Sequence, residues 1–193
     1  MKNLIEIQEK LKEILKRKRF EHTLGVRYTA AALAMCHGCD VYQAELAGLL
    51  HDCAKGYTEQ ELLEISSQRG IVVSVAEEKA PHLLHAKVGA YLAEHIYGVE
   101  DQDVLEAIRF HTTGKPSMTK LEKIIFIADY IEPNRKMLEA LPEVRKMAFQ
   151  NLDKTMFQIL ENTLRYLKET NGADGIDDTT YCAYEYYKSK ISG

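Results

Sequence analysis

LLHDCAKG, the stretch at residues 49–56, ends an otherwise apolar segment with a histidine, an aspartate and a lysine. Ionisable groups that lose contact with water are tolerated in a fold only when they are paired or bind a metal ion. His51 and Asp52 follow Leu49 and Leu50 directly, so both need a partner from another part of the chain.

Two further polar residues occur inside apolar helical patterns, His22 in RFEHTLGV and Asp129 in IIFIADYIEP. An unpartnered carboxylate at a position such as Asp129 costs several kcal/mol, so it too needs a cation. Imidazoles with carboxylates suit iron, manganese, zinc and other divalent metals. His22, His51, Asp52 and Asp129, from three predicted helices, can close around one ion inside a bundle.

Lys55 lies four residues after His51 and three after Asp52, which places its ammonium on the same face of a predicted helix. One interpretation is that Lys55 points at an anion bound to the metal. The other is that Lys55 pairs with Asp52 at a helix C-terminus, where a cation is favoured by the helix dipole. The residues of this segment alone do not separate the two.

Apolar residues recur at spacings of three and four along the chain, which predicts an all-α fold of about nine or ten helices. Capping residues at Asp40, Thr58 and Ser74 are each followed by Glu or Gln three places on. The 193 residues, 46% of them hydrophobic, predict a single domain spanning 1–193. The predicted helices span 3–17, 20–37, 41–55, 59–69, 74–79, 82–97, 101–113, 118–131, 142–170, where a break near Asp153 is left open, and 178–190.

Composition excludes several classes of function. A net charge of −4 argues against a broad surface for nucleic acid, which relies on clustered Lys and Arg. No stretch reaches the roughly 18 apolar residues of a membrane span, and the first residues do not resemble a signal peptide. Four scattered cysteines predict reduced thiols, and CHGC at residues 36–39 is interpreted as partly buried thiols at a turn between helices. We therefore expect a cytoplasmic protein with no nucleic-acid or membrane partner.

An isolated His, a His-Asp doublet and a distant Asp, all on predicted helices, resemble the HD superfamily of metal-dependent phosphohydrolases. Longer strings are similar to its YqeK-type branch, the symmetrical bis(5'-nucleosyl)-tetraphosphatases. These strings are LLHDCAKG (49–56), LLHAKVGAYLA (83–93) and AIRFHTTGKPSMTKLEKIIFIADYIEPNR (107–135). With His22, these strings cover residues 20 to 135, and they follow one another in the order typical of that branch.

The resemblance implies roles for individual residues. The metal ligands would be His22, His51, Asp52 and Asp129, with iron as the usual ion of the family and manganese, magnesium or another divalent metal as alternatives. Catalysis would involve Asp52, Lys55, His85 and His111. The nucleotide diphosphate would contact His22, Lys55, His85, His111, Thr112, Asp129 and Arg135, together with a loop formed by Gly172, Ala173, Asp174, Gly175, Ile176 and Asp177.

The implied reaction is symmetrical cleavage of diadenosine tetraphosphate into two ADP molecules, so the expected ligands are a dinucleoside polyphosphate or a nucleoside diphosphate. Splitting a phosphoanhydride needs a nucleophilic water, and a metal ion supplies one by lowering the pKa of the water towards about 7. Lys55, Arg135 and the two imidazoles of His85 and His111 would neutralise phosphate charge.

Several alternatives stay open at this point. His85 and His111 are interpreted as phosphate contacts, because HTTG at residues 111–114 ends a helix at a turn; they could instead hold a second metal ion. Another HD-type nucleotidase or phosphodiesterase, and a nucleotide-sensing binding module, are the alternative functions. A homodimer is compatible with the tyrosine-rich last helix but no pattern requires it.

Overall fold

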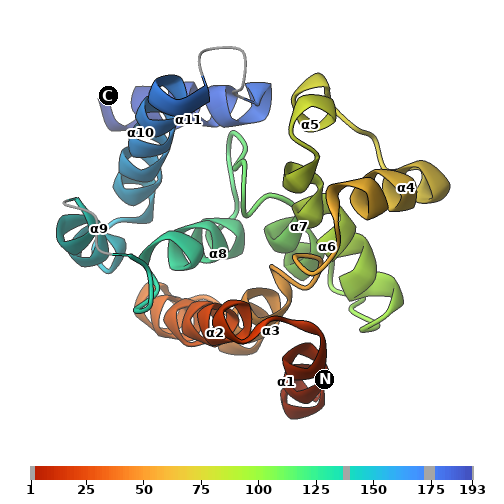
Figure 1. Ribbon diagram of the computed structural model, residues 1–193. Coiled ribbons are helices and arrows are strands. Elements are labelled where there is room, and N and C mark those ends of the chain that lie inside the picture. Colours follow the sequence, from red (N-terminus) through yellow and green to blue (C-terminus); the bar gives the residue numbers. More distant parts are fainter. Residues whose placement is uncertain (1–2, 137–139, 172–176, 193) are drawn as a thin grey trace.

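The segment that carries Asp129 forms α8 (Lys120–Ile131), a helix that packs against several others. Eight of its twelve residues are buried, among them Ile124, Ile125 and Ile127, so this helix cannot lie at the surface. In the computed structural model, which describes residues 3–136, 140–171 and 177–192, α8 contacts helices from both halves of the chain (Figure 1). Any polar group on its inner face is therefore held among several helices.

The described residues form eleven α-helices and one short 3-10 helix, η1, and no strand (Figure 1). In chain order they are α1 (Leu4–Ile14), α2 (Arg17–His37), α3 (Val41–Leu50), α4 (Glu59–Arg69), α5 (Val75–Lys79), η1 (Pro81–Leu84), α6 (His85–His95), α7 (Gln102–Arg109), α8, α9 (Leu141–Ala148), α10 (Leu152–Asn171) and α11 (Asp178–Ser192).

The predicted all-α class is confirmed, and the predicted count of nine or ten falls short because residues 142–170 form two helices. The break lies just before α10, where the Asn151 side chain accepts a hydrogen bond from the Lys154 backbone N–H and caps the new helix. Capping at Asp40, Thr58 and Ser74 is confirmed, the last two as complete capping boxes.

The prediction of a helix from 41 to 55 is wrong at its end, because α3 stops at Leu50. The backbone N–H groups of Cys53 and Lys55 bond to carbonyls three residues back, at Leu50 and Asp52, so the chain tightens into turns. The His51 imidazole hydrogen-bonds to the Gly48 carbonyl, which in a continued helix would accept the N–H of residue 52. His51 and Asp52 therefore project from a turn at the end of α3.

Close contact between α2 and α3 fixes where that turn lies. Gly48 permits it, since a Cβ at this position would lie 3.0 Å from the Cα of Arg27. One large apolar cluster runs from Ile7 in α1 to Tyr187 in α11, and a smaller one joins Ala54 to α4, η1 and α6. The single domain over 1–193 stays a prediction. Within the described residues, no helix is both long and apolar enough to cross a bilayer.

Candidate metal centre

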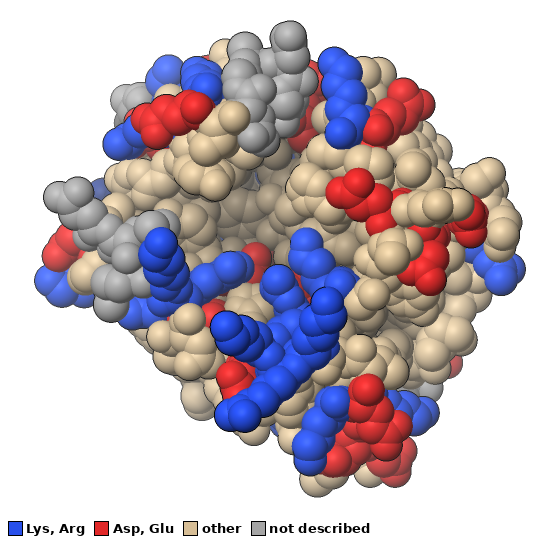
Figure 2. Space-filling model, in the orientation of Figure 1, with Lys and Arg blue, Asp and Glu red and all other residues tan. Residues whose placement is uncertain are grey.

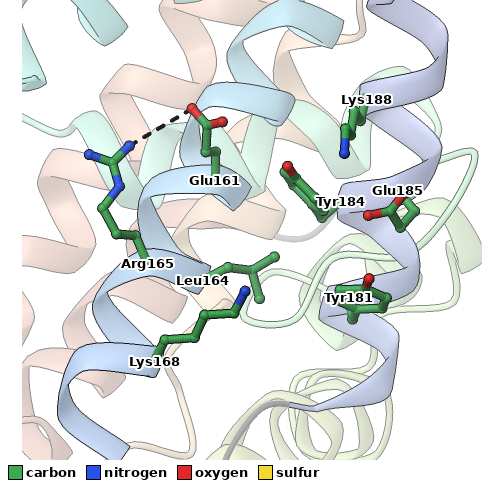
Figure 3. Close-up of a pocket in the computed structure, with 8 residues that line it drawn as sticks. All are labelled: Glu161, Leu164, Arg165, Lys168, Tyr181, Tyr184, Glu185 and Lys188. Atoms are coloured by element: carbon green, nitrogen blue, oxygen red, sulfur yellow. Dashed lines mark ion pairs between the residues drawn. The ribbon is translucent and has the colours of Figure 1, made fainter. Parts of the chain in front are cut away.

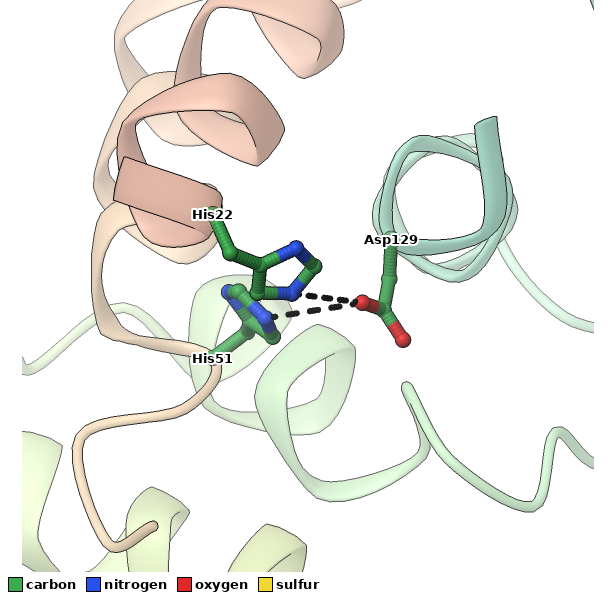
Figure 4. A group of neighbouring side chains, drawn as sticks. All are labelled: His22, His51 and Asp129. Atoms are coloured by element: carbon green, nitrogen blue, oxygen red, sulfur yellow. Dashed lines mark ion pairs between the residues drawn. The ribbon is translucent and has the colours of Figure 1, made fainter. Parts of the chain in front are cut away.

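The four predicted ligands lie together between α2, the turn after α3, and α8. Nε2 of His22 is 3.0 Å from Oδ1 of Asp129, and Nε2 of His51 is 3.8 Å from the same oxygen (Figure 4). Oδ2 of Asp52 lies 3.7 Å from Nε2 of His22 and 3.4 Å from Nε2 of His51. Residues that are distant in the sequence thus direct two imidazole nitrogens and two carboxylates at one point.

Each imidazole is turned so that Nε2 faces this point. Nδ1 of His51 bonds to the Gly48 carbonyl at 2.7 Å, and Nδ1 of His22 bonds to the Glu132 carboxylate at 3.0 Å. Because these oxygens accept hydrogen bonds, each Nδ1 carries the hydrogen and each Nε2 presents a lone pair.

Those lone pairs fit a metal ion. Nε2 of His22 and Nε2 of His51 are both buried and have no hydrogen-bond partner. A buried polar atom without a partner is costly, and a cation would satisfy both nitrogens at once. His22, His51 and Asp129 offer ligand atoms within 4.8 Å of one another, as do His51, Asp52 and His111. Two imidazoles and two carboxylates form a donor set for a divalent metal.

His85 and His111 lie on the other side of Asp52. Oδ1 of Asp52 is 3.3 Å from Nε2 of His85 and 3.6 Å from Nε2 of His111. Their Nδ1 atoms bond to the His82 and Ile108 carbonyls three residues back, at 2.6 and 2.7 Å. The Asp52 carboxylate therefore lies between two pairs of imidazoles.

The two Nε2 atoms of this second pair are 3.2 Å apart. With both Nδ1 atoms bonded to carbonyls, two lone pairs face each other in the neutral rings, an arrangement that a hydrogen donor or a cation would stabilise. The Thr112 hydroxyl is 3.2 Å from Nε2 of His85 and 3.1 Å from Nε2 of His111, but its single hydrogen can serve one of them. Burial lowers the pKa of His85 to about 4, so this imidazole is neutral near pH 7.

Lys55 is directed at this second pair. Nζ lies 3.2 Å from Nδ1 of His85, a nitrogen whose hydrogen already goes to His82. Among the described carboxylates, none is within 4.0 Å of Nζ, so the predicted alternative of an ion pair with Asp52 is not formed. Burial lowers the pKa of Lys55, and the nearby Asp52 carboxylate opposes that shift.

Two arginines hold the carboxylates. Arg19 Nη1 contacts Oδ2 of Asp52 at 2.6 Å, and the Arg135 guanidinium pairs with Asp129. Burial alone would raise the pKa of both carboxyls, but the pKa of Asp52 is lowered by the neighbouring imidazoles, His51 first among them, and that of Asp129 by the neighbouring His22 and by the Arg135 charge. Both carboxylates are thus ionised and able to bind a cation.

Sequence reasoning missed Arg19 and Glu132. Arg19 stands three residues before His22, on the same face of α2, and this spacing could have identified it. Glu132 is 1% exposed, and its Oε2 also accepts a hydrogen bond from the Asn134 backbone N–H at 2.7 Å. A Cβ at Gly25 would lie 2.3 Å from this same Oε2, so Gly25 leaves the space that Glu132 fills.

Most of the predicted nucleotide loop, Gly172 to Ile176, lies outside the described residues. Asp177 is described and nearly buried, and its carboxylate has two structural partners. Oδ1 accepts from the Thr179 backbone N–H, and Oδ2 accepts from the Ser74 hydroxyl at 3.2 Å. Asp177 thus connects the start of α11 to the start of α5, and a contact with nucleotide stays a prediction.

A separate cavity of about 390 Å³ lies between α10 and α11 (Figure 3). Its walls carry both signs of charge, with Glu161 and Arg165 paired on α10 and Glu185 and Lys188 on α11. None of the residues predicted for the metal centre lines it. The chemistry of the cluster therefore does not extend into this cavity.

Comparisons with known proteins agree with this arrangement. The HD domain matches residues 19–134, an interval that contains all four predicted metal ligands. A symmetrical bis(5'-nucleosyl)-tetraphosphatase from Bacillus subtilis is 42% identical over 83% of this chain and 86% of its own length. A protein of the same name from Halalkalibacterium halodurans is 44% identical over 83% of this chain and 85% of its own length.

A crystal structure from Clostridium acetobutylicum, described as a predicted HD superfamily hydrolase involved in NAD metabolism, superposes with a TM-score of 0.93. It is 38% identical to this chain, and the match covers 98% of this chain and 99% of the other. The fold around the cluster is therefore one that an experimental structure also contains.

Proposed function

Since the chain belongs to the HD domain family, in the branch of symmetrical bis(5'-nucleosyl)-tetraphosphatases, we propose that its metal centre hydrolyses diadenosine tetraphosphate to two ADP molecules. The observation that carries the proposal is the pair of buried, unpartnered Nε2 atoms of His22 and His51, which face two ionised carboxylates. In the reaction, water adds to one inner phosphorus atom, and the bridging oxygen leaves with the other half of the substrate.

His22, His51, Asp52 and Asp129 are the proposed ligands of a divalent ion, and iron is the proposed metal. The mixed set of imidazoles and carboxylates supports iron or manganese better than a thiolate metal. Such an ion supplies Lewis-acid chemistry, because it polarises a phosphoryl oxygen and lowers the pKa of a water ligand towards about 7. Glu132 keeps the His22 ring in the orientation that this role requires.

His85 and His111 were predicted to contact phosphate, with a second metal ion as the alternative. The opposed lone pairs, 3.2 Å apart, and the lowered pKa of His85 support the alternative. A neutral imidazole that presents a lone pair repels a phosphate oxygen, whereas it binds a cation. We therefore propose that His85 and His111, with Oδ1 of Asp52, hold a second ion beside the first.

Three cations are proposed to neutralise the phosphates. Lys55 has no carboxylate partner among the described residues and lies beside His85, so its charge is available to an anion. Arg19 and Arg135 each retain 38% of their side-chain exposure while they contact Asp52 and Asp129. Their planar guanidinium groups can bind phosphate oxygens in pairs. Thr112, beside both imidazoles, can donate its hydroxyl hydrogen to a phosphate oxygen.

We also propose that the protein works in the cytoplasm. All four cysteines are free thiols, two of them exposed, which supports the predicted reducing environment of the cytoplasm. Homodimer formation stays a prediction.

The test is to identify the products from diadenosine tetraphosphate by chromatography, together with metal analysis of the purified protein. ADP as the sole nucleotide product supports the proposal, whereas ATP with AMP would contradict symmetrical cleavage. A panel of nucleoside mono- and triphosphates and cyclic nucleotides separates the other HD reactions. Binding of the dinucleotide without turnover, in protein loaded with iron or manganese, would favour the nucleotide-sensing module.

A further inference from the structure

A basic groove of about 480 Å³ lies beside the metal centre, on the side of His22. Its walls come from the start of α2 and from the segment after α8, and they include Lys18, Arg19, His22, Asn134, Arg135 and Lys136. Figure 2 shows Lys and Arg side chains gathered along one edge of a hollow in this face, over the start of α2.

The cations of this groove exceed its anions. Glu132 is bonded to His22, and the other acidic residue of the wall, Glu21, pairs with Arg17 at 2.8 Å. Lys18 and Lys136 are exposed and have no ion pair with any described carboxylate. Two lysine charges therefore face the groove unneutralised, next to the two arginines that hold Asp52 and Asp129.

The groove and Lys55 lie on opposite sides of the Asp52 carboxylate. Oδ2 contacts Arg19 and faces His22 and His51, whereas Oδ1 faces His85 and His111, beside which Lys55 lies. Cations thus lie on both sides of the point where the ligands converge. An anion that extends over the centre meets positive charge in both directions.

This inference rests on the proposed function. A dinucleoside tetraphosphate has two identical halves, and cleavage between the inner phosphates leaves one nucleoside diphosphate on each side of the metal centre. The centre has no matching symmetry, so the two halves must contact different residues. We propose that the basic groove binds the nucleoside diphosphate half on the His22 side, with Lys18 and Lys136 recognising its phosphates, while the half on the other side lies against Lys55 and Thr112.

The variant K18Q/K136Q tests the proposal, and K10Q/K154Q is its matched control. Both pairs are exposed lysines, and both substitutions change the net charge by the same amount. Neither Lys10 nor Lys154 lines the groove. We expect K18Q/K136Q to raise KM for diadenosine tetraphosphate about tenfold, so that the loss in kcat/KM comes chiefly from KM, because the lost contacts stabilise bound substrate and transition state alike. The control pair should leave KM within twofold.

A second measurement counts ADP bound to metal-loaded protein by equilibrium dialysis, up to millimolar ADP. Wild type should bind two ADP per chain, and K18Q/K136Q one. An unchanged KM in K18Q/K136Q, an equal rise in the control pair, or a single ADP in wild type would each overturn the proposal. Wild-type protein that fails to cleave the dinucleotide identifies the different failure, that of the proposed function itself.

Discussion

The Glu132 carboxylate accepts a hydrogen bond from Nδ1 of His22 at 3.0 Å, across 110 residues of sequence. The opposite nitrogen of the same ring, Nε2, is one of the buried atoms without a partner. A carboxylate in this position fixes the tautomer of a metal-binding histidine and makes Nε2 more basic. We therefore propose that Glu132 is a positioning residue, which acts on the proposed metal ion through His22.

Glu132→Gln should weaken binding of the metal by about 10- to 100-fold, since the neutral amide cannot accept hydrogen bonds at both of its ends from His22 and Asn134. A competition titration with a chelator of known affinity measures this change. Glu122→Gln is the control, because Glu122 is equally buried but its carboxylate accepts a hydrogen bond from the Thr119 backbone N–H at the start of α8 and pairs with Lys115. The control should lower the Tm and keep the metal affinity. Equal affinities for Glu132→Gln and wild type would remove the positioning role.

Gly25→Ala should also weaken metal binding, because it displaces the Glu132 carboxylate instead of replacing it. The added methyl would lie 2.3 Å from Oε2 of Glu132, so the carboxylate must move away from His22. Gly38→Ala is the comparison, since Gly38 has a φ of +64° and nothing within 4 Å of a new Cβ. It should destabilise the fold by about 1 kcal/mol and leave metal affinity unchanged. Equal metal affinity in both alanine variants would contradict the packing argument.

Asp52→Ala should abolish turnover and lower metal content. It removes a charged ligand that contacts imidazoles on both of its sides, and no other described carboxylate occupies that position. Metal analysis and product chromatography on the same preparation test this. A variant that retains both metal and activity would refute the assignment of the centre.

His111→Ala separates the two roles considered for its imidazole. If His111 is a ligand of a second ion, its loss should reduce the metal content from two equivalents per chain to one. Added metal should then partly restore the rate. If His111 contacts phosphate, its loss should lower kcat/KM by roughly 10²-fold and leave the metal content unchanged. His95→Ala, at an exposed histidine stacked on Tyr91, is the control and should match wild type in both measurements. One equivalent in wild type would support the phosphate role.

Removing the metal should lower thermal stability. An ion at one hundred times its Kd contributes about 2.7 kcal/mol, which for a chain of this length corresponds to roughly 5–10 °C in Tm. Thermal melts with and without a chelator, and after addition of iron or manganese, measure the shift. Asp52→Ala is the matched control and should show little response to metal. An equal response in wild type and Asp52→Ala would place the stabilising ion elsewhere.

Helical periodicity and capping residues were sufficient to predict the all-α class and most of the helices. Both signals depend on residues that are close together in the sequence. The end of α3 was predicted wrongly because the side chain of His51 uses the Gly48 carbonyl, a competition that periodicity does not reveal. The clustering of His22, His51, Asp52 and Asp129 was predictable, since a histidine or aspartate inside an apolar pattern needs a cation or a hydrogen-bond partner to offset its burial. The contact between Glu132 and His22 was not predicted, because Glu132 follows the apolar run of α8 and meets His22 only in the folded chain.

The proposal that His85 and His111 hold a second ion also rests on geometry that only the folded chain provides. Their positions in the sequence do not show that both Nδ1 hydrogens go to backbone carbonyls, nor that both Nε2 atoms face Asp52. Geometry of this kind depends on which carbonyls are left free where a helix starts or ends.

The separation of His22 from Asp129 and Glu132 along the chain also sets an order of events during synthesis. A ribosome has made α1 to α7 before it reaches the codons for α8, so the nascent chain contains His22, His51 and Asp52 without the residues that complete the centre. Chains fold from the N-terminus as they emerge, and α2 can pack on α3 at that stage. A half-made chain therefore lacks Asp129 and Glu132, so the proposed site between His22, His51 and Asp129 can be complete only after α8 has left the exit tunnel.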